Sequence, residues 1–412
     1  MNLELFIAKR LYGTRKGARR ISRPAVAIAQ WGVAIGAVIM IASICIIVGF
    51  KQQVREKLYG FGGHIQIMSY SNDAATETPL TADSALLAEL HNIPNIAHIQ
   101  QYTHKQGLIV ANDEYEGVVI KGVCGDYDLS LIESHVVEGK IPQFCDTASS
   151  GSIVLSQSMA GKLKAKVGDR INIYFLDKGI RARKQTVAAI YNTHLTEFDN
   201  TIAFTDIYTT RSIHDWECNE SSAIEIHISD YSRLEQTRDI VTDIAIDAAD
   251  RNDETLSVPT IEELNMHMFE WLALLDQTVW LILILVVCIA AFTMVSGLLI
   301  IILEKSNLIG ILKATGAKDY SIRRIFIYYA SFIIGRGIII GNIIGLLLCY
   351  LQQQFKIVAI DPEMYYMDRV PIEFSWLLVP MNIAMFIISV AALVLPSMLI
   401  STIEPTKAIK FE

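Results

Sequence analysis

Four stretches of the chain are almost continuously apolar, and the charged residues gather between them. Residues 24–50, 278–303 and 374–400 carry no charged side chain, and residues 325–351 carry only Arg336. A helix needs about 20 apolar residues to cross the ~30 Å hydrocarbon layer, whereas helices of soluble domains average about 11–12 residues. The pattern therefore predicts four transmembrane helices, which we place at 24–50, 272–303, 325–351 and 374–400.

The long segment between the first two spans, residues 51–271, has the mixed pattern of a water-exposed α/β domain. Two β–α–β patterns occur, the first over residues 63–110 and the second over residues 223–258. Between them, residues 112–220 contain short alternating runs bounded by Gly, Asp and Asn, which predict a series of strands. The fold class is therefore an α+β membrane protein whose outer domain is a split ferredoxin-like subdomain with an inserted β-rich subdomain.

The distribution of lysine and arginine predicts the orientation of the spans. Basic residues crowd the N-terminal tail (1–23) and the loop 304–324, but the loop 352–373 holds only Lys356 and Arg369. Short basic loops stay on the cytoplasmic side of a membrane. We therefore expect both tails (1–23 and 401–412) and the 304–324 loop to be cytoplasmic, with residues 51–271 outside. The first span is too long for a cleavable signal peptide and is interpreted as an anchor.

Composition and cysteine usage exclude some classes of function. The chain is 52% hydrophobic and 19% charged, with a net charge of −8, which does not favour a nucleic-acid partner. Three of the six cysteines lie in the predicted spans. The other three, Cys124, Cys145 and Cys218, fit no zinc spacing and no complete disulfide set, which leaves one Cys124–Cys145 bridge or free thiols as the alternatives.

No catalytic motif is present in the sequence. The chain contains no G-x-x-x-x-G-K-[ST] phosphate loop, no H-E-x-x-H and no G-x-S-x-G, and its nine histidines are scattered. A membrane-bound enzyme is therefore the weakest of the functional hypotheses, and we expect no cofactor and no metal in this chain.

Glycines recur every fourth position in two spans, and small residues at this spacing let helices approach closely. Packing within the chain and dimerisation are both consistent with the pattern. The glycines concerned are Gly32, Gly36, Gly337, Gly341 and Gly345. Next to them, Arg336 lies at mid-membrane depth, where a charge is expensive and indicates either a functional site or a side chain that reaches the interface.

The loop 304–324 predicts a short amphipathic helix. Apolar residues at 308, 309, 311 and 312 are flanked by Lys305 and Lys313. Such a helix either lies among lipid headgroups or inserts into the groove of a cytoplasmic partner, and the residue pattern favours neither hypothesis.

The sequence resembles a known family at this loop and at the C-terminus. The loop Glu304–Ala317 (EKSNLIGILKATGA) and the ending 403–412 (IEPTKAIKFE) are similar to motifs of the FtsX-like/MacB-like permease superfamily of ABC transporters. The string at 361–371 (DPEMYYMDRVP) resembles, more specifically, the lipoprotein-releasing (LolC/LolE) branch. The likeness extends over essentially the whole chain.

The resemblance implies a transport function. Such a permease is a non-catalytic subunit that pairs with a second permease, identical or related, and with a cytoplasmic ABC ATPase dimer that binds ATP and Mg²⁺. It lies in the bacterial inner membrane with its large domain in the periplasm. The lipoprotein-releasing branch extracts lipoproteins from the outer leaflet and passes them to a periplasmic carrier. The alternative is a mechanotransmission permease that drives a periplasmic partner, in efflux or cell-wall hydrolysis, without lipoprotein cargo.

The resemblance also assigns site residues. The helix that couples to the ATPase is expected at about 304–317, with a cargo cavity along the first two spans. The carrier-docking hairpin of the family corresponds to residues near 177–181, where this chain is short, which argues against direct carrier docking. The expected coupling residues are Glu304, Lys305, Leu308, Ile309, Gly310, Leu312, Lys313, Ala314 and Gly316, and the expected cavity residues are Met40, Ile44, Ile47 and Val48.

Overall fold

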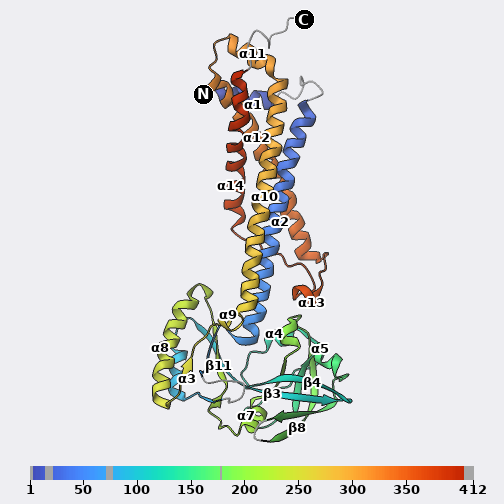
Figure 1. The fold of residues 1–412 in the computed structure, drawn as a ribbon, viewed down its shortest axis with the longest axis vertical. Helices are drawn as coiled ribbons and strands as arrows, with labels where there is room; N and C mark the ends of the chain where they lie inside the picture. Colours follow the sequence, from blue (N-terminus) through green and yellow to red (C-terminus); the bar gives the residue numbers. More distant parts are fainter. Residues whose placement is uncertain (1–2, 14–21, 71–77, 177–178, 403–412) are drawn as a thin grey trace. The chain divides into compact units, whose positions relative to one another are not determined.

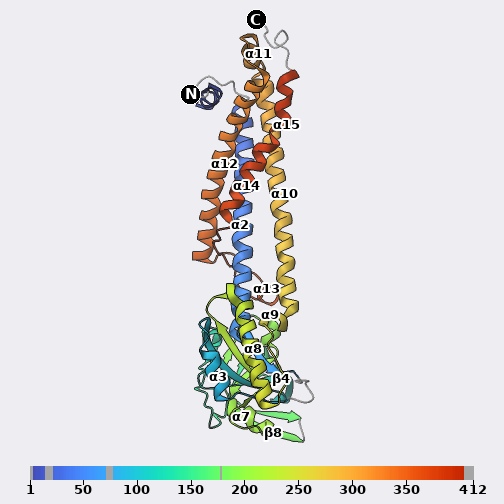
Figure 2. The ribbon, with the colours of Figure 1, turned by 90° about the vertical axis from the view of Figure 1, so that its left-hand side faces the viewer.

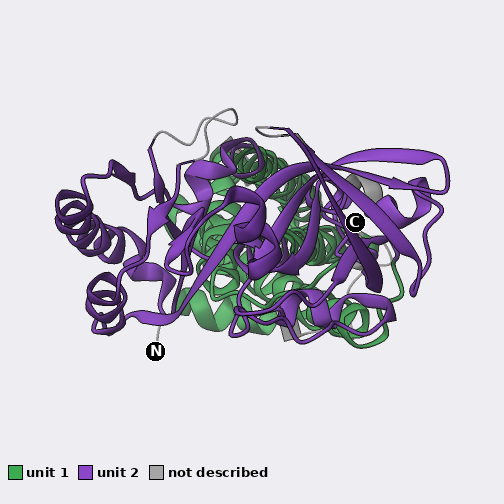
Figure 3. Ribbon diagram, turned by 90° about the horizontal axis from the view of Figure 1, so that it is seen from below, with its two compact units in different colours: residues 1–51, 271–358, 370–412 green, residues 52–270, 359–369 purple. Residues whose placement is uncertain are grey.

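The computed structural model describes residues 3–13, 22–70, 78–176 and 179–402, and its helices and strands are labelled in Figure 1. The chain divides into two compact units, coloured separately in Figure 3. Unit 1 comprises residues 1–51, 271–358 and 370–412, and unit 2 comprises residues 52–270 and 359–369. The C-terminal motif at 403–412 lies outside the described residues.

Four helices of the described chain are long and apolar enough to cross a membrane. The spans are Val26–Gly62, Met266–Glu304, Asp319–Phe355 and Leu378–Ser397. They belong to α2 (Ser22–Gly62), α10 (Met266–Glu304), α12 (Asp319–Phe355) and the pair α14 (Leu378–Ala392) and α15 (Val394–Ser397). The first three helices continue beyond the ends that hydropathy predicts, because their polar flanks remain helical.

The fourth span is shorter than the apolar stretch that predicts it. Its helix begins at Leu378, four residues after Phe374, and is interrupted after Ala392. Pro380 lies in the first turn, where its missing N–H removes no helical bond. Pro396 has no N–H to donate to the carbonyl of Ala392, so the regular helix ends there.

Helices α2 and α12 pack closely within unit 1, and the glycines of α12 make this possible. A Cβ atom placed on Gly341 would lie 2.5 Å from the carbonyl oxygen of Ala34 and 2.6 Å from Cβ of Ala37. The other two glycines of the stripe meet α2 at similar range, with 2.9 Å to Gln30 O from Gly337 and 3.1 Å to Ile41 Cδ1 from Gly345. The stripe therefore serves packing within this chain. In α2, a Cβ atom on Gly32 would lie 2.6 Å from Thr293 Cγ2 of α10, and one on Gly36 would lie 3.3 Å from Met385 Cε of α14.

Unit 2 is built on one twisted sheet of ten strands. Its main path runs β12-β1-β11-β3-β4-β9-β6-β8-β5, and β7 pairs with β3 and β8. The strand bounds are β1 Ile65–Ser69, β3 Ile96–Ala111, β4 Glu114–Val123, β5 Val136–Gly139, β6 Ser152–Ser156, β7 Arg170–Leu176, β8 Ile180–Tyr191, β9 Ile202–Asp206, β11 Ala223–Ile228 and β12 Leu256–Ser257, with β2 (Leu80–Thr81) and β10 (Glu220–Ser221) forming a separate pair.

One end of this sheet is covered by two helices. The strands β12, β1, β11 and β3 are all antiparallel to their neighbours. Helices α3 (Ser84–His91) and α8 (Leu234–Asn252) share one apolar core with these strands, and they are drawn beside each other in Figures 1 and 2. Apolar residues at every second position of β1 and β11 and the i, i+4 spacing in α8 (Val241, Ala245) account for this layer.

The other end of the sheet has a core of its own. It is formed by β4, β6, β7, β8 and β9 with α5 (Gln157–Lys162) and α7 (Ile207–His214). The long strand β3 contributes to both cores: Ile99 belongs to the first, whereas Ile109 and Ala111 belong to the second. The boundary between the two parts therefore runs through a strand and does not follow a loop.

Candidate functional site

The loop between α10 and α12 contains the predicted amphipathic helix. Helix α11 covers Ser306–Ala314 and is followed by Gly316, whose φ of +90° is a left-handed conformation that glycine adopts without strain. Lys313 forms an ion pair with Asp319 at 3.1 Å and donates to the carbonyl of Ser401 at 3.3 Å. These contacts hold α11 against the start of α12 and the segment after α15.

The two faces of α11 have different environments. Ile309 is 0% exposed and Gly310 is buried, both against the apolar core of unit 1, and Leu312 packs on the same core. Ile311 is 52% exposed on the opposite side. Asn307, one turn before it, is exposed too. Because residues four apart share a helical face, the side of α11 that is available to a partner centres on Ile311.

The expected coupling residues differ in exposure, and the structure shows them as buried, half-buried or exposed. Ile309 and Gly310 face the chain's own core and are not free to dock. Ile311, which lies outside the expected set, is exposed, and no sequence pattern distinguishes it from the buried Ile309. Of the remaining residues, Ala314 and Gly316 are exposed and Glu304, Lys305, Leu308, Leu312 and Lys313 are half-buried.

Glu304, the last residue of α10, is the most unusual member of the set. Both its carboxylate oxygens are buried, and neither receives a hydrogen bond from the described residues. The nearest described cation is Lys305, with its Nζ atom 3.7 Å from Oε1. A carboxylate taken out of water normally has donors around it.

The expected cargo residues of α2 lie mostly inside unit 1. Met40 and Ile44 are 1% exposed and belong to the packed core, while Ile47 and Val48 are half-buried. The first two therefore present no surface to a cargo in this structure. A different stripe of α2 is exposed, consisting of Ile28, Trp31, Ile35, Ile39 and Ile46.

The structure also shows the surroundings of Arg336, the charged residue within the third span. Arg336 is exposed on α12 and takes part in an interaction. Asp276, the nearest candidate acid by sequence, is paired instead with Lys51 at 2.6 Å.

Within unit 2, a buried lysine joins the last turns of α2 to two distant segments. Lys57 is 9% exposed, and its Nζ atom donates to the carbonyl of Thr193 at 2.6 Å and to that of Tyr366 at 2.7 Å. Tyr366 follows α13 (Pro362–Tyr365), in the segment between the third and fourth spans. This contact gives the 361–371 string a structural role, because it fixes that segment to α2.

A second buried lysine holds the end of the same helix. Lys121 on β4 donates to Oε1 of Glu225 and to the carbonyl of Phe61, both at 2.6 Å. The second carboxylate oxygen of Glu225 accepts from Gln100 at 2.8 Å and from Tyr127 at 2.7 Å. Burial lowers the pKa of Lys121, an effect that Glu225 opposes, and burial raises the pKa of Tyr127 well above its usual value.

These two contacts form what we call the lysine joint, defined by Lys57, Lys121 and Glu225. Carbonyls in the last turn of a helix lack partners within the helix, and a cation there is stabilised by the helix dipole. Gln66 satisfies the neighbouring carbonyl of Gly62 at 2.8 Å. The end of α2 is thus bound into the sheet through charged and amide donors.

Nothing in the described residues indicates catalysis. No group of three or more His, Cys, Asp and Glu side chains there is placed to hold a metal ion. Cys124 and Cys145 are both free thiols, so the bridge considered from the sequence does not form. The two features that stand out are the exposed face of α11 and the lysine joint at the end of α2.

Comparison with known proteins identifies the family. The model of the MacB-like periplasmic core domain matches residues 27–244, and that of the FtsX-like permease C-terminal region matches residues 280–405. The periplasmic region of MacB from Actinobacillus actinomycetemcomitans covers 51% of this chain and 95% of its own, at 12% identity and a TM-score of 0.34.

Curated relatives match over nearly the whole length. The lipoprotein-releasing system transmembrane protein LolC of Neisseria meningitidis is 22% identical over 400 residues, and LolE of Haemophilus influenzae is 23% identical over 396 residues. Each alignment covers 92% of this chain and 92% of the relative. The chain therefore belongs to the FtsX-like/MacB-like permease superfamily of ABC transporters, and it is similar throughout to members of its lipoprotein-releasing branch.

Proposed function

We propose that the chain is the permease subunit of an ABC transporter that extracts lipoproteins from the outer leaflet of the bacterial inner membrane. The observation that carries this proposal is the similarity to LolC and LolE over 92% of each chain. Withdrawing lipid chains from a bilayer costs about 0.8 kcal/mol per CH₂ group. Removal of an acylated protein therefore needs an external source of energy, which a separate ATPase chain supplies by binding ATP and Mg²⁺.

The proposed input is helix α11. The exposed face around Ile311 inserts into a groove of the cytoplasmic ATPase dimer, and the buried carboxylate of Glu304 accepts a hydrogen bond from it. Both tails then lie in the cytoplasm and unit 2 in the periplasm, as the basic residues near the membrane favour.

The proposed output is unit 2, which the lysine joint binds to the end of α2. Displacement of α2 would act on β4 and β11 through Lys121 and Glu225, and on the 359–369 segment through Lys57. A second permease, identical or related, completes the cargo path. The surface of this chain that faces the cargo is the exposed stripe of α2 that includes Trp31, Ile35 and Ile39.

We further propose that the first part of unit 2 is a split ferredoxin-like subdomain. Its strands follow one another along the sheet in the order fourth, first, third, second; α3 lies between the two strands of the first β–α–β half, and α8 lies between those of the second. The β-rich part between β3 and β11 is the insertion.

Transfer to a periplasmic carrier is the less direct part of the proposal. Strands β7 and β8 pair as far as Leu176 and Ile180, which leaves three residues of sequence between them, and two of these, 177 and 178, lie outside the described residues. A hairpin this short supports assigning carrier docking to the second permease or to another surface. A permease that drives a periplasmic partner without lipoprotein cargo is the competing function.

Reconstitution separates the two functions. The full chain, its partner permease and its ATPase are placed in liposomes that carry a triacylated lipoprotein, and ATP-dependent release to a soluble carrier is measured. Release that requires hydrolysable ATP supports lipoprotein extraction. ATP hydrolysis without release, from a complex whose assembly has been verified, rejects lipoprotein cargo in favour of the competing function.

A further inference from the structure

Helix α1 (Leu3–Gly13) lies across the end of α12 at which α12 begins. In Figure 2 the short helix beside the N-terminal mark is seen end-on, whereas α12 runs vertically, so the axes of the two helices cross. Ala8 is 0% exposed, and Glu4 forms an ion pair with Arg324 of α12 at 3.6 Å. One side of α1 is therefore fixed to α12 within unit 1.

The ion pair places α1 at the level of the membrane boundary. Arg324 directly precedes the apolar stretch 325–351 that predicts the third span, so it marks the depth at which charged side chains give way to hydrocarbon. A helix that lies crosswise at this depth has the position of an interfacial helix, whose apolar residues enter the boundary between headgroups and acyl chains by about 5–10 Å.

The side of α1 that is not covered by the chain carries apolar and basic residues together. Leu3, Leu5 and Phe6 are 68%, 43% and 43% exposed, and Lys9 and Arg10 are exposed one turn further along. Residues three and four apart share a helical face, so Lys9 lies beside Leu5 and Phe6. We call these five residues the outward face of α1.

The charge of the outward face favours an anionic partner. Glu4, the one acidic residue in the sequence of α1, is 15% exposed and paired with Arg324. No further acidic residue follows in the sequence before Glu56. Each basic side chain close to an anionic membrane surface strengthens attachment roughly fivefold.

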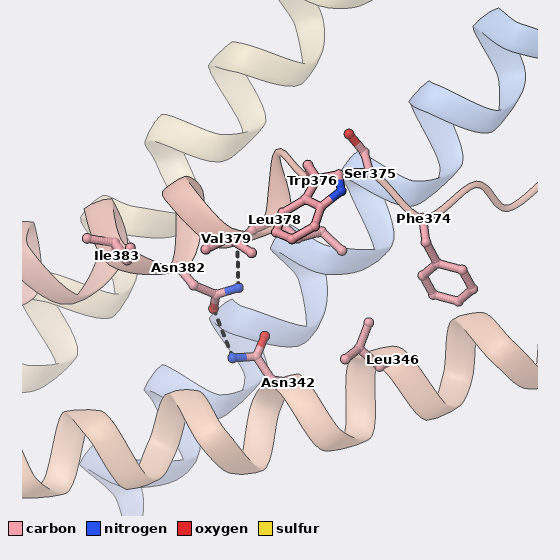
Figure 4. Close-up of a pocket in the computed structure, with 9 residues that line it drawn as sticks. All are labelled: Asn342, Leu346, Phe374, Ser375, Trp376, Leu378, Val379, Asn382 and Ile383. Atoms are coloured by element: carbon pink, nitrogen blue, oxygen red, sulfur yellow. Dashed lines mark hydrogen bonds between the residues drawn. The ribbon is translucent and has the colours of Figure 1, made fainter.

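The groove between α12 and α14 lacks this property. Its lining contains no charged side chain, and Nδ2 of Asn342 donates to Oδ1 of Asn382 at 3.0 Å (Figure 4). The groove therefore has no group that distinguishes anionic from zwitterionic headgroups by charge. Residues 374–378, which line it, can serve as an internal reference when lipids are compared.

We propose that the outward face of α1 binds the surface of a leaflet that contains anionic phospholipid, such as phosphatidylglycerol. Lys9 and Arg10 meet the anionic headgroups, and Phe6 lies among the upper parts of the acyl chains. The leaflet thereby holds the first turns of α12 through the ion pair of Glu4 with Arg324. The site uses neither the exposed face of α11 nor a lipoprotein cargo, so it does not rest on the function proposed above.

The test measures amide hydrogen exchange of α1 by mass spectrometry. The full chain is held in nanodiscs of phosphatidylcholine with or without phosphatidylglycerol. Two cations at about fivefold each predict that exchange of residues 3–13 is roughly 10- to 30-fold slower with the anionic lipid, because exchange follows detachment of the helix. Residues 374–378 should exchange equally in both lipids. At about 1 M salt, where the Debye length is about 3 Å, the difference for α1 should disappear.

Three variants separate charge from apolar contact. Lys9→Gln should reduce the ratio of the exchange rates in the two lipids about fivefold. The control Lys318→Gln removes the same charge from an exposed position just before α12 and should keep the ratio. Phe6→Ser removes apolar surface and no charge, so it should speed the exchange of α1 by a similar factor in both lipids.

The contrary results are equally specific. Equal exchange of α1 in the two lipids overturns the proposal, and so does a difference that survives at high salt. An unaltered ratio in Lys9→Gln, or an equal fall in Lys318→Gln, overturns the assignment of the cations. Unchanged exchange in Phe6→Ser shows that the outward face stays outside the leaflet and overturns the proposal. Exchange that slows only when the ATPase is added overturns it in favour of a protein partner.

Discussion

The exposed face of α11 gives the sharpest prediction, because one side chain dominates it. Replacement of Ile311 by aspartate should weaken binding of the ATPase while leaving the membrane helices intact. Gly310 is less suitable, because it is buried and a larger residue there would also disturb the chain's own core.

The size of the effect follows from the exposure of Ile311. Full burial of such a side chain contributes about 1.5–3 kcal/mol, and 52% of it remains to be buried on docking. Ile311→Ala should therefore lose about 0.8–1.5 kcal/mol, or roughly fourfold to twelvefold in Kd. Ile311→Asp also leaves a carboxylate without a partner, which adds about 1–3 kcal/mol, so we expect a loss of roughly 20-fold or more.

The assay is a titration of purified ATPase onto the permease in nanodiscs. Ile357→Asp is the matched control, since Ile357 is 69% exposed in the segment that follows α12. It should bind the ATPase as the unmodified chain does. If Ile311→Asp stays within threefold of that control, α11 does not dock through this face and the assignment of the input is wrong.

Three further experiments test the packing and the lysine joint. Gly341→Ala should destabilise the full chain by about 1–3 kcal/mol through overpacking. The control Gly335→Ala, where the nearest neighbour would be 3.9 Å away, should leave the midpoint of thermal unfolding unchanged or higher. Equal midpoints for the two variants would contradict the close contact between α2 and α12. Lys57→Met should retain ATP hydrolysis but lower lipoprotein release per ATP at least about tenfold, since each lost hydrogen bond from the charged lysine contributes about 1.5–3 kcal/mol. An unaltered ratio of lipoprotein release to ATP hydrolysis would count against a role for the lysine joint. Lys121→Met and Glu225→Met should each lower the free energy of unfolding by about 3–5 kcal/mol, and the double variant should lose clearly less than the sum of the two. Additive losses, measured by thermal unfolding, would show that the two residues act independently.

Much of the fold could be predicted from residue periodicity. The alternating run that became β11 and the helical spacing of α8 are local signals that do not depend on distant residues. Short elements were missed although their caps are visible in the sequence. Ser156 and Asp206 accept hydrogen bonds from the backbone three residues on and start α5 and α7, which is the ordinary pattern of a helix N-cap.

The lysine joint could not be predicted, and the reason is physical. Lysine is almost always exposed unless it is paired, and the partners of Lys57 are 136 and 309 residues away in the chain. Those of Lys121 are 60 and 104 residues away. No local pattern marks such a position, because its burial depends on a carbonyl or a carboxylate that only the folded chain supplies.

For a related reason, the sequence could not predict which face of α11 is buried and which is exposed. The spacing of Leu308, Ile309, Ile311 and Leu312 indicates an apolar helix, but apolar residues surround much of its circumference. Which side packs on the chain's own core depends on α12 and the segment after α15, and only the structure shows that Ile309 is covered and Ile311 is not.

The sharing of β3 between two cores has a consequence for how unit 2 folds and can be divided. Its first residues pair with β11 and its last with β4 and β7. Excision of the inserted part would therefore leave the last residues of β3 without their partner strands. Pairing of β3 with β4 is a local hairpin, whereas its pairing with β11 and β7 joins segments far apart in sequence and is therefore slow. We expect its amides to exchange with solvent only when the whole unit opens, as one cooperative block.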